Sequence, residues 1–265
     1  MRAQLTAINK SPLIIGHRGA SAVAPENTLA SFARALRDGA DGIELDVRLA
    51  RDGVPVVIHD ATLSRTRLRK RSVANMPSGQ LQQIDVGSWF NQAYRRLARL
   101  EYTRQTIPTL DDVFALLANQ AKRDFIVYVE LKSLRNQKRN AELARAVIEV
   151  VHRREIQRRV VLISFNLWSL ARLKNLTPSI RTGALFGPRQ RAIKSARQII
   201  AAAIASGADE ILLHHRIATM KMIAAAHQNN LVPGVWTVDD DKWMARARNL
   251  QINAIMTNHP AKMLA

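Results

Sequence analysis

Apolar and polar positions follow two alternating periods along most of this chain. Short apolar runs, which predict strands, occupy residues 13–17, 43–49, 54–59, 125–131, 160–165, 182–186, 210–214, 232–238 and 254–257. Between most of them apolar residues recur every three or four positions, which predicts helices at residues 28–37, 110–120, 141–153, 167–174, 191–206, 219–230 and 242–249. Repeated strand–helix units indicate parallel strands joined by helical crossovers.

The number of units favours a closed barrel. Asp52-Gly53 predicts a hairpin turn that returns residues 54–59 against the preceding strand, which leaves eight strands for the barrel. Eight such units suit a single (β/α)8, or TIM, barrel over residues 1–265. An open, doubly wound sheet is the alternative fold, but no G-x-G-x-x-G motif opens the first helix.

Residues 61–108 interrupt this alternation. The segment has weak periodicity, turn-forming residues at Pro77-Ser78-Gly79, and a basic cluster formed by Arg65, Arg67, Arg69, Lys70 and Arg71. It is too long for an ordinary connection, so we expect a small insertion between the second and third βα units, lying over one end of the barrel. The last helix, after the final strand, is expected to be very short or missing.

Composition limits where the protein is expected to reside and which metal ligands it can offer. No window approaches the roughly 18 uncharged apolar residues of a membrane span, and the first residues lack the pattern of a signal peptide. We therefore expect a soluble, cytoplasmic protein. The chain has no cysteine, so any bound metal must use oxygen or imidazole ligands.

The chain is strongly basic, with 40 Lys and Arg against 21 Asp and Glu and a net charge of +19. This balance favours anionic partners such as a phosphorylated metabolite, an anionic membrane or nucleic acid, although a general bias toward arginine would also explain it. A basic nucleic-acid-binding module has no other support, because no helix-turn-helix, aromatic stacking surface or zinc pattern accompanies the charge.

Carboxylates stand at the ends of two predicted strands. Glu44 and Asp46 are two residues apart on a strand, so their side chains leave the same face. A divalent metal with oxygen ligands would relieve their mutual repulsion, and so would an inward Lys or Arg. Glu130 and Lys132 repeat this spacing on another strand. Glu130 can be a third metal carboxylate and Lys132 a phosphate-binding group, or the two can simply form an ion pair with each other.

Two histidines also close predicted strands, where the βα loops of a barrel build active sites. His17 is followed by Arg18, whose guanidinium suits phosphate oxygens, and His59 is followed by an aspartate. A strand-end histidine can also be a structural hydrogen-bonding group. Residues 25–28 predict a turn with Asn27 or Thr28 as the helix N-cap, and Trp236 is a candidate for lining either a pocket or the core.

The motifs together resemble a known family. They are, in order, His17-Arg18-Gly19-Ala20, Pro25-Glu26-Asn27-Thr28, Gly39-Ala40-Asp41-Gly42-Ile43-Glu44-Leu45-Asp46-Val47, Asp52-Gly53-Val54-Pro55-Val56-Val57-Ile58-His59-Asp60, Thr62-Leu63-Ser64-Arg65-Thr66, Ile107-Pro108-Thr109-Leu110, Glu130-Leu131-Lys132, Ser164-Phe165, Trp236-Thr237-Val238 and Thr257-Asn258-His259-Pro260. Each piece is weak alone, but the ordered set closely resembles the glycerophosphodiester phosphodiesterases.

The resemblance implies a TIM barrel with a small insertion and a phosphodiesterase activity. Members hydrolyse glycerophosphodiesters, such as glycerophosphocholine or glycerophosphoethanolamine, to sn-glycerol 3-phosphate and an alcohol, which implies a place in lipid and glycerol metabolism. By their positions in the motifs, Glu44, Asp46 and Glu130 are expected to hold a divalent metal, Mg²⁺ or Ca²⁺.

The resemblance also implies roles for other residues. His17 and His59 are expected to form the acid–base pair, and we assign the acid to His59 and the base to His17. Arg18 and Lys132 are expected to bind phosphate, and Trp236 to pack near the glycerol. An alternative with the same chemistry is a lysophospholipase D acting at anionic membrane surfaces, to which the basic chain would bind peripherally.

Overall fold

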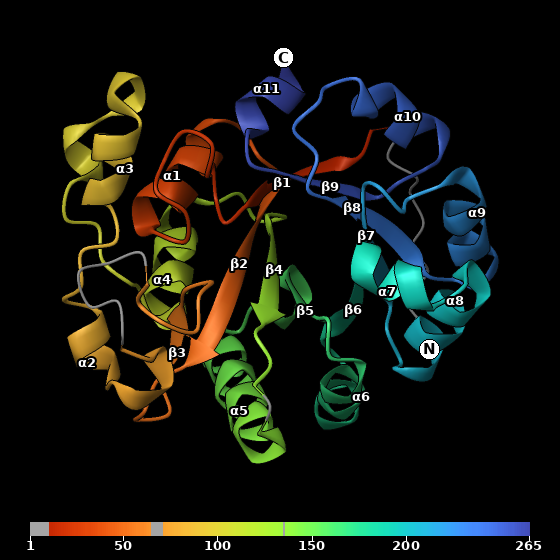
Figure 1. Ribbon diagram of the computed structural model, residues 1–265, viewed down its shortest axis with the longest axis horizontal. Coiled ribbons are helices and arrows are strands. Elements are labelled where there is room, and N and C mark those ends of the chain that lie inside the picture. Colours follow the sequence, from red (N-terminus) through yellow and green to blue (C-terminus); the bar gives the residue numbers. More distant parts are fainter. Residues whose placement is uncertain (1–10, 65–70, 135) are drawn as a thin grey trace.

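The computed structural model describes residues 11–64, 71–134 and 136–265, and its centre is a closed β-barrel (Figure 1). The barrel strands are β1 (Leu13–His17), β2 (Gly42–Leu49), β4 (Ile126–Leu131), β5 (Val160–Ser164), β6 (Arg181–Phe186), β7 (Glu210–His214), β8 (Val232–Trp236) and β9 (Ala254–Thr257). Each pairs in parallel with its neighbours, and β1 closes the ring by pairing with both β2 and β9. The predicted TIM barrel is confirmed.

Helices connect and surround the strands (Figure 1). They are α1 (Leu29–Arg37), α4 (Leu110–Gln120), α5 (Gln137–Arg153), α6 (Leu167–Leu176), α7 (Pro188–Ile193), α8 (Ala196–Ala205), α9 (Met220–Gln228), α10 (Trp243–Asn249) and α11 (Pro260–Leu264). The last of these is short, as predicted. Among the described helices, none is long and apolar enough to cross a membrane.

Capping residues decide where two helices begin. The predicted helix over residues 191–206 is wrong, because Lys194 is extended and Ser195 starts a second helix by accepting a hydrogen bond from the Gln198 backbone N–H. Helix α5 begins at Gln137, earlier than predicted, because the Asn136 side chain caps it by accepting from the Arg139 N–H. Periodicity alone does not detect such local hydrogen bonds.

The segment 61–108 has its own secondary structure. Strand β3 (Pro55–Val57) pairs antiparallel with β2, as the hairpin prediction required, and the chain rejoins the helical layer at α4. Between them the described elements are η1 (Val73–Asn75), α2 (Ser78–Leu81), α3 (Ser88–Ala93), η2 (Arg95–Leu97) and η3 (Leu100–Tyr102). Of the predicted basic cluster, Arg71 is exposed, and Arg65, Arg67, Arg69 and Lys70 lie outside the described residues.

Two apolar cores lie on opposite faces of the barrel wall. Ile43, Leu45 and Val47 of β2 belong to the large core between barrel and helices. Ile15 and Leu212 belong to the smaller core that fills the lumen, together with other inward side chains of the strands. Because side chains alternate along a strand, Glu44 and Asp46, which alternate with the three β2 residues of the large core, must face the lumen.

The lumen also holds a polar group near the amino-terminal ends of the strands. Glu210, the first residue of β7, is buried, and its two carboxylate oxygens are both occupied. The Tyr128 hydroxyl donates to one at 2.9 Å, and the Arg181 guanidinium donates to the other at 3.2 Å. Burial raises the pKa of Glu210, and the charge of Arg181 opposes that rise. This group joins β4, β6 and β7 from inside.

We expect Glu210→Ala to lower the free energy of unfolding by about 3 kcal/mol, because it leaves a buried hydroxyl and a half-buried guanidinium unpaired. Urea unfolding followed by circular dichroism measures this change. Glu142→Ala is the matched control, since it removes a more exposed Arg–Glu pair at 3.0 Å and should change stability by less than about 1 kcal/mol. Equal unfolding midpoints for the two variants would contradict the expectation.

Candidate active site

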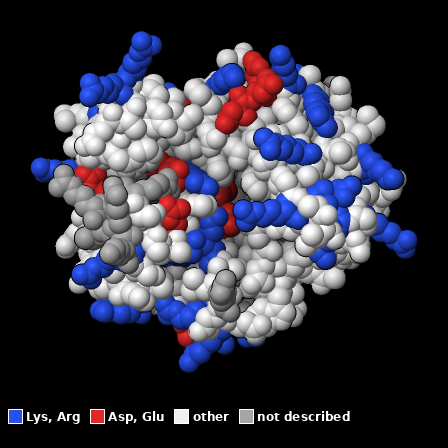
Figure 2. All heavy atoms as spheres, in the orientation of Figure 1, with Lys and Arg blue, Asp and Glu red and all other residues white. Residues whose placement is uncertain are grey.

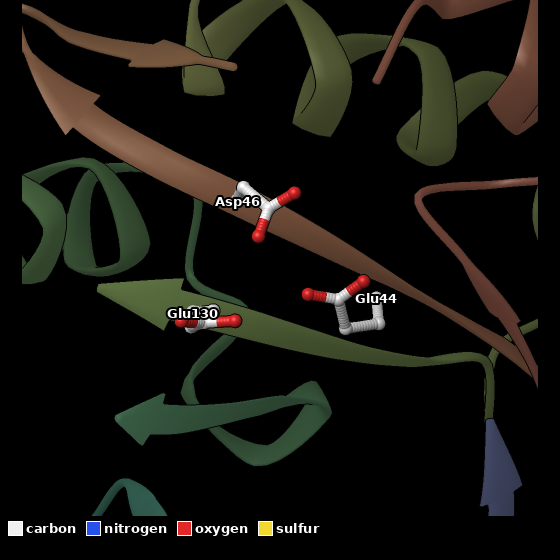
Figure 3. Close-up of side chains that lie close together, drawn as sticks. All are labelled: Glu44, Asp46 and Glu130. Carbon is white, nitrogen blue, oxygen red and sulfur yellow. The ribbon is translucent and has the colours of Figure 1, made fainter. Parts of the chain in front are cut away.

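Three carboxylates meet inside the carboxyl-terminal half of the barrel. Glu44 and Asp46 come from β2 and Glu130 from β4, and the register of the two strands sets Asp46 opposite Glu130. One oxygen from each carboxylate lies within 4.8 Å of the others, and all three residues are buried. Figure 3 shows the three side chains directed toward one another from adjacent strands. The predicted common inward face of Glu44 and Asp46 is confirmed.

Two cations lie against the carboxylates. Lys132 Nζ is 2.8 Å from Asp46 Oδ1 and 2.8 Å from Glu130 Oε1, so it bridges the two strands. Arg18 Nε is 3.1 Å from Asp46 Oδ2 on the other side. Both alternatives raised by the sequence therefore have support, because the carboxylates form one cluster and also pair with an inward Lys and Arg.

The turn after β1 positions Arg18. Arg18 and Gly19 have φ angles of 56° and 83°, in the left-handed region that favours glycine. A Cβ on Gly19 would lie only 2.6 Å from the Ser31 carbonyl carbon, so the turn packs tightly on α1. This conformation directs the Arg18 N–H to Glu44 Oε2 at 3.0 Å.

Residues 25–28 contribute more than the structural turn that the sequence indicated. Thr28 is the N-cap of α1 and accepts from the Ser31 N–H. Asn27 is not the cap, because its amide nitrogen donates to Asp46 Oδ2 at 2.7 Å and its oxygen accepts from the Asp46 N–H at 3.2 Å. Glu26 Oε1 pairs with Arg18 Nη1 at 3.0 Å. This turn therefore fixes both Asp46 and Arg18.

The carboxylates differ in their affinity for protons. Burial and the charge of Asp46 raise the pKa of Glu44 to about 8. Burial also raises the pKa of Glu130 to about 7, and Lys132 opposes the rise. For Asp46 burial acts in the same upward direction, but Lys132 and Arg18 outweigh it and hold its pKa well below the usual range. Only with all three carboxylates ionised would the cluster carry more negative charge than its two cations compensate, and the raised pKa values of Glu44 and Glu130 reflect the cost of that state.

This donor set fits a hard divalent cation. Mg²⁺ and Ca²⁺ prefer carboxylate oxygens, three such groups converge here, and the chain has no cysteine. The carboxylate of Glu44 is the least compensated of the three: it accepts from the Arg18 N–H, and its Oε2 lies 3.8 Å from His17 Nε2.

A chain of hydrogen bonds orients His17. Its Nδ1 is 2.8 Å from Asn258 Oδ1, and the Asn258 amide nitrogen donates to Asp239 Oδ2 at 2.8 Å. Because Asp239 requires the amide nitrogen as donor, Asn258 presents its oxygen to the histidine, and Nδ1 must carry the proton. The lone pair of Nε2 is thereby directed toward the carboxylates. Burial, followed by the charge of Arg18, lowers the pKa of His17.

His59, which follows β3, has a different partner. Its Nδ1 is 2.8 Å from the Asp60 carboxylate, and its backbone oxygen accepts from Arg48. Burial lowers the pKa of His59, whereas the charge of Asp46 and the hydrogen bond to Asp60 act to raise it.

Trp236, at the end of β8, is half-buried beside the lumen. Its indole N–H donates to the Leu212 backbone oxygen at 3.1 Å, and its ring meets Phe165 edge to face at 5.5 Å between centroids. The sequence prediction assigned no role to Asn258 or Asp239. The signal that could have found them is their place at the ends of β9 and β8, where site residues gather.

Comparison with known proteins identifies the family of this chain. The model of the glycerophosphoryl diester phosphodiesterase family matches residues 17–262. The chain belongs to this family. The glycerophosphodiester phosphodiesterase of Caldanaerobacter subterraneus subsp. tengcongensis is 30% identical over 95% of this chain and 96% of its own length. The glycerophosphodiester phosphodiesterase of Bacillus subtilis is 30% identical over 94% of this chain and 84% of its own.

Solved structures of family members share the fold. An Oleispira antarctica phosphodiesterase in complex with the product sn-glycerol-3-phosphate superposes with a TM-score of 0.82 at 29% identity, covering 96% of each chain. The glycerophosphodiester phosphodiesterase of Agrobacterium tumefaciens str. C58 has a TM-score of 0.75 at 27% identity, covering 95% of this chain and 98% of its own. The predicted family and its phosphodiesterase class are confirmed: the chain is a phosphoric diester hydrolase.

We expect binding of Mg²⁺ or Ca²⁺ to release protons, because a carboxylate that coordinates a metal must give up its proton. The raised pKa values of about 8 for Glu44 and about 7 for Glu130 leave protonated carboxyls at neutral pH. Affinity should therefore rise as the pH increases through this range and then level off.

Titration calorimetry in two buffers of different ionisation enthalpy measures the protons released. Glu44→Gln should both weaken binding and reduce proton release, whereas Glu149→Gln on the exposed face of α5 should change neither. Equal binding enthalpies in the two buffers, with an affinity independent of pH, would show that the carboxylates are already ionised.

Proposed function

We propose that this enzyme hydrolyses glycerophosphodiesters, such as glycerophosphocholine and glycerophosphoethanolamine, to sn-glycerol 3-phosphate and an alcohol. The observation that carries the proposal is the convergence of three buried carboxylates with Arg18 and Lys132 at one end of the lumen. The product sn-glycerol-3-phosphate bound to the Oleispira antarctica relative supports the same substrate class. This reaction would belong to lipid and glycerol metabolism.

In this proposal Glu44, Asp46 and Glu130 hold a divalent metal, Mg²⁺ or Ca²⁺. A bound metal supplies Lewis-acid polarisation of a phosphoryl oxygen. Arg18 and Lys132 bind the remaining phosphoryl oxygens and neutralise the charge that grows in the transition state. Their ion pairs with Asp46 support this role, since they place both cations beside the carboxylate cluster.

The two histidines share the proton transfers. The neutral Asn258 partner of His17 leaves Nε2 free to accept a proton, which suits a general base. The Asp60 carboxylate beside His59 stabilises an imidazolium, which suits a general acid that protonates the leaving alcohol. The partners thus support His17 as the base and His59 as the acid.

The proton removed by His17 can come from either of two nucleophiles. Water can attack phosphorus directly, or the glycerol 2-hydroxyl can attack first and form a cyclic phosphate that water then opens. In both routes the bond from phosphorus to the head-group oxygen breaks. Trp236 stands beside the lumen and would pack its indole against the glycerol carbons.

A second candidate keeps this chemistry and changes the substrate to a lysophospholipid in an anionic membrane. The net charge of +19 favours it, because an anionic surface attracts such a chain. Turnover of lysophosphatidylcholine in vesicles, compared with soluble glycerophosphocholine, distinguishes the two candidates.

We expect metal-dependent release of sn-glycerol 3-phosphate from glycerophosphocholine. EDTA should abolish the release, and Mg²⁺ or Ca²⁺ should restore it. Glu44→Gln should lower kcat by at least about 100-fold, because it removes one carboxylate of the cluster. Glu149→Gln is the matched surface control and should keep full activity. Unchanged turnover in EDTA would refute the role proposed for the carboxylates.

Substrates with different leaving groups separate the two histidines. We expect His59→Ala to lose about 10²–10⁴-fold in rate on glycerophosphocholine and to recover most of it on a glycerophosphate ester of p-nitrophenol, whose leaving group needs no proton. His17→Ala should be impaired on both substrates. A His59→Ala variant with the wild-type rate on glycerophosphocholine would exclude His59 as the acid.

A further inference from the structure

Exposed apolar side chains gather on the connections that follow β5, β6 and β7. Phe165 and Trp168 follow β5, Ile193 follows β6, and Met220 follows β7, with exposed fractions of 37, 45, 79 and 70%. In a TIM barrel all connections that follow strands emerge on the face where the carboxylate cluster opens. Within the described residues, these four side chains therefore share that face.

The same connections, and the one that follows β4, carry exposed cations. They are Lys138, Arg172, Arg189, Arg191, Lys194, Arg197, Arg216 and Lys221. Residues 156–238 contain only two acidic residues, Asp209 and Glu210, which lie at the opposite, amino-terminal end of β7. We call these eight cations and four apolar side chains the basic rim. Asp240 and Asp241, after β8, mark its boundary.

Charge on this face is divided between a hollow and its surroundings. Figure 2 shows acidic and basic side chains together in a central hollow, an exposed acidic patch at the upper edge, and Lys and Arg side chains over the part of the face where α7, α8 and α9 lie in Figure 1. The acidic cluster is buried, so a large partner approaching the part of this face formed by α7, α8 and α9 meets mainly positive charge, together with the exposed Ile193 and Met220.

A groove lies at the edge of the basic rim. It lies between α5 and α6, has a volume of about 330 Å³, and is lined by three cations (Lys138, Arg145 and Arg172), one acid (Glu142), Trp168, Gln137 and Ala141. The Arg172 guanidinium lies 5.2 Å from the centre of the Trp168 ring. A cationic groove beside an exposed indole suits the interface of a membrane, where tryptophan and lysine side chains are enriched.

We propose that the basic rim docks the enzyme on an anionic lipid bilayer, with the opening of the active site toward the lipid. Lipid phosphates pair with the cations, and Ile193, Met220 and Trp168 enter the interface. A bilayer is a better match than nucleic acid, because a phosphodiester backbone offers no apolar environment for Ile193 and Met220. The consequence for substrate choice rests on the proposed function, whereas docking itself does not.

The experiment compares two triple variants of equal charge. Arg189→Glu/Lys194→Glu/Lys221→Glu alters the basic rim, and Arg123→Glu/Arg158→Glu/Arg248→Glu alters exposed arginines on connections at the other end of the barrel. Sedimentation with vesicles of phosphatidylserine and phosphatidylcholine measures the half-saturating lipid concentration. We expect the rim variant to raise it at least about tenfold and the control by less than about threefold.

A third variant tests the apolar contribution. Ile193→Ser/Met220→Ser keeps the charge. We expect it to weaken vesicle binding most clearly at about 150 mM salt, because the Debye length there is only about 8 Å and surface charges are screened. All variants should retain wild-type turnover of soluble glycerophosphocholine, since none alters the carboxylate cluster or its partners. This turnover also shows that each variant is folded.

Each outcome decides the proposal. Equal weakening by the rim and control variants would mean that net charge alone drives binding, and the rim would not be a docking surface. Absence of wild-type binding to anionic vesicles at low salt would also overturn it, as would rim-dependent binding of a DNA duplex that outcompetes the vesicles. Rim-dependent vesicle binding by an enzyme inactive on glycerophosphocholine would uphold docking and refute the proposed function.

Discussion

The concentration of negative charge inside the barrel is the constraint that the rest of this structure serves. Three carboxylates share a buried space in which water cannot screen them, and each would be costly there without compensation. Arg18 and Lys132 supply part of that compensation, and the Asn27 amide supplies hydrogen bonds to Asp46. Because these partners come from three different segments, the charge also determines how the first turn, β2 and β4 must be arranged.

The barrel tolerates this charge because the remainder of the lumen is well packed. Apolar side chains from most strands fill its middle, and the Glu210 group satisfies its own polar atoms toward the amino-terminal end. Polar chemistry is thereby divided into two separate layers. In the layer near the amino-terminal ends of the strands, both carboxylate oxygens of Glu210 are hydrogen-bonded within the lumen. In the layer near the carboxyl-terminal ends, no Lys or Arg side chain of the described residues forms an ion pair with Glu44, and the carboxylate cluster therefore retains the capacity to bind a cation.

The position of His17 depends on two segments far apart in the sequence, the end of β1 and the residues after β9, which barrel closure brings together. His17 ends β1, and the Asn258 side chain that fixes its tautomer follows β9, the neighbour of β1 in the closed ring. Asp239 then fixes Asn258 and accepts from the Thr257 hydroxyl. On the outer surface, exposed cations outnumber exposed acids along the connections that follow β5, β6 and β7.

The sequence by itself determined the alternation of strands and helices, the shared inward face of Glu44 and Asp46, and the ordered motifs that identify the family. These follow from the period of two along a strand and from local spacing, which every chain segment carries with it. Only the tertiary structure decided the partners: Asn258 for His17 at a separation of 241 residues, Asn27 for Asp46, and Glu26 for Arg18. The break between α7 and α8 also escaped the periodic pattern, because a single capping serine decides it. A side chain's partner depends on how strands register and close, and no local pattern in the sequence encodes that closure.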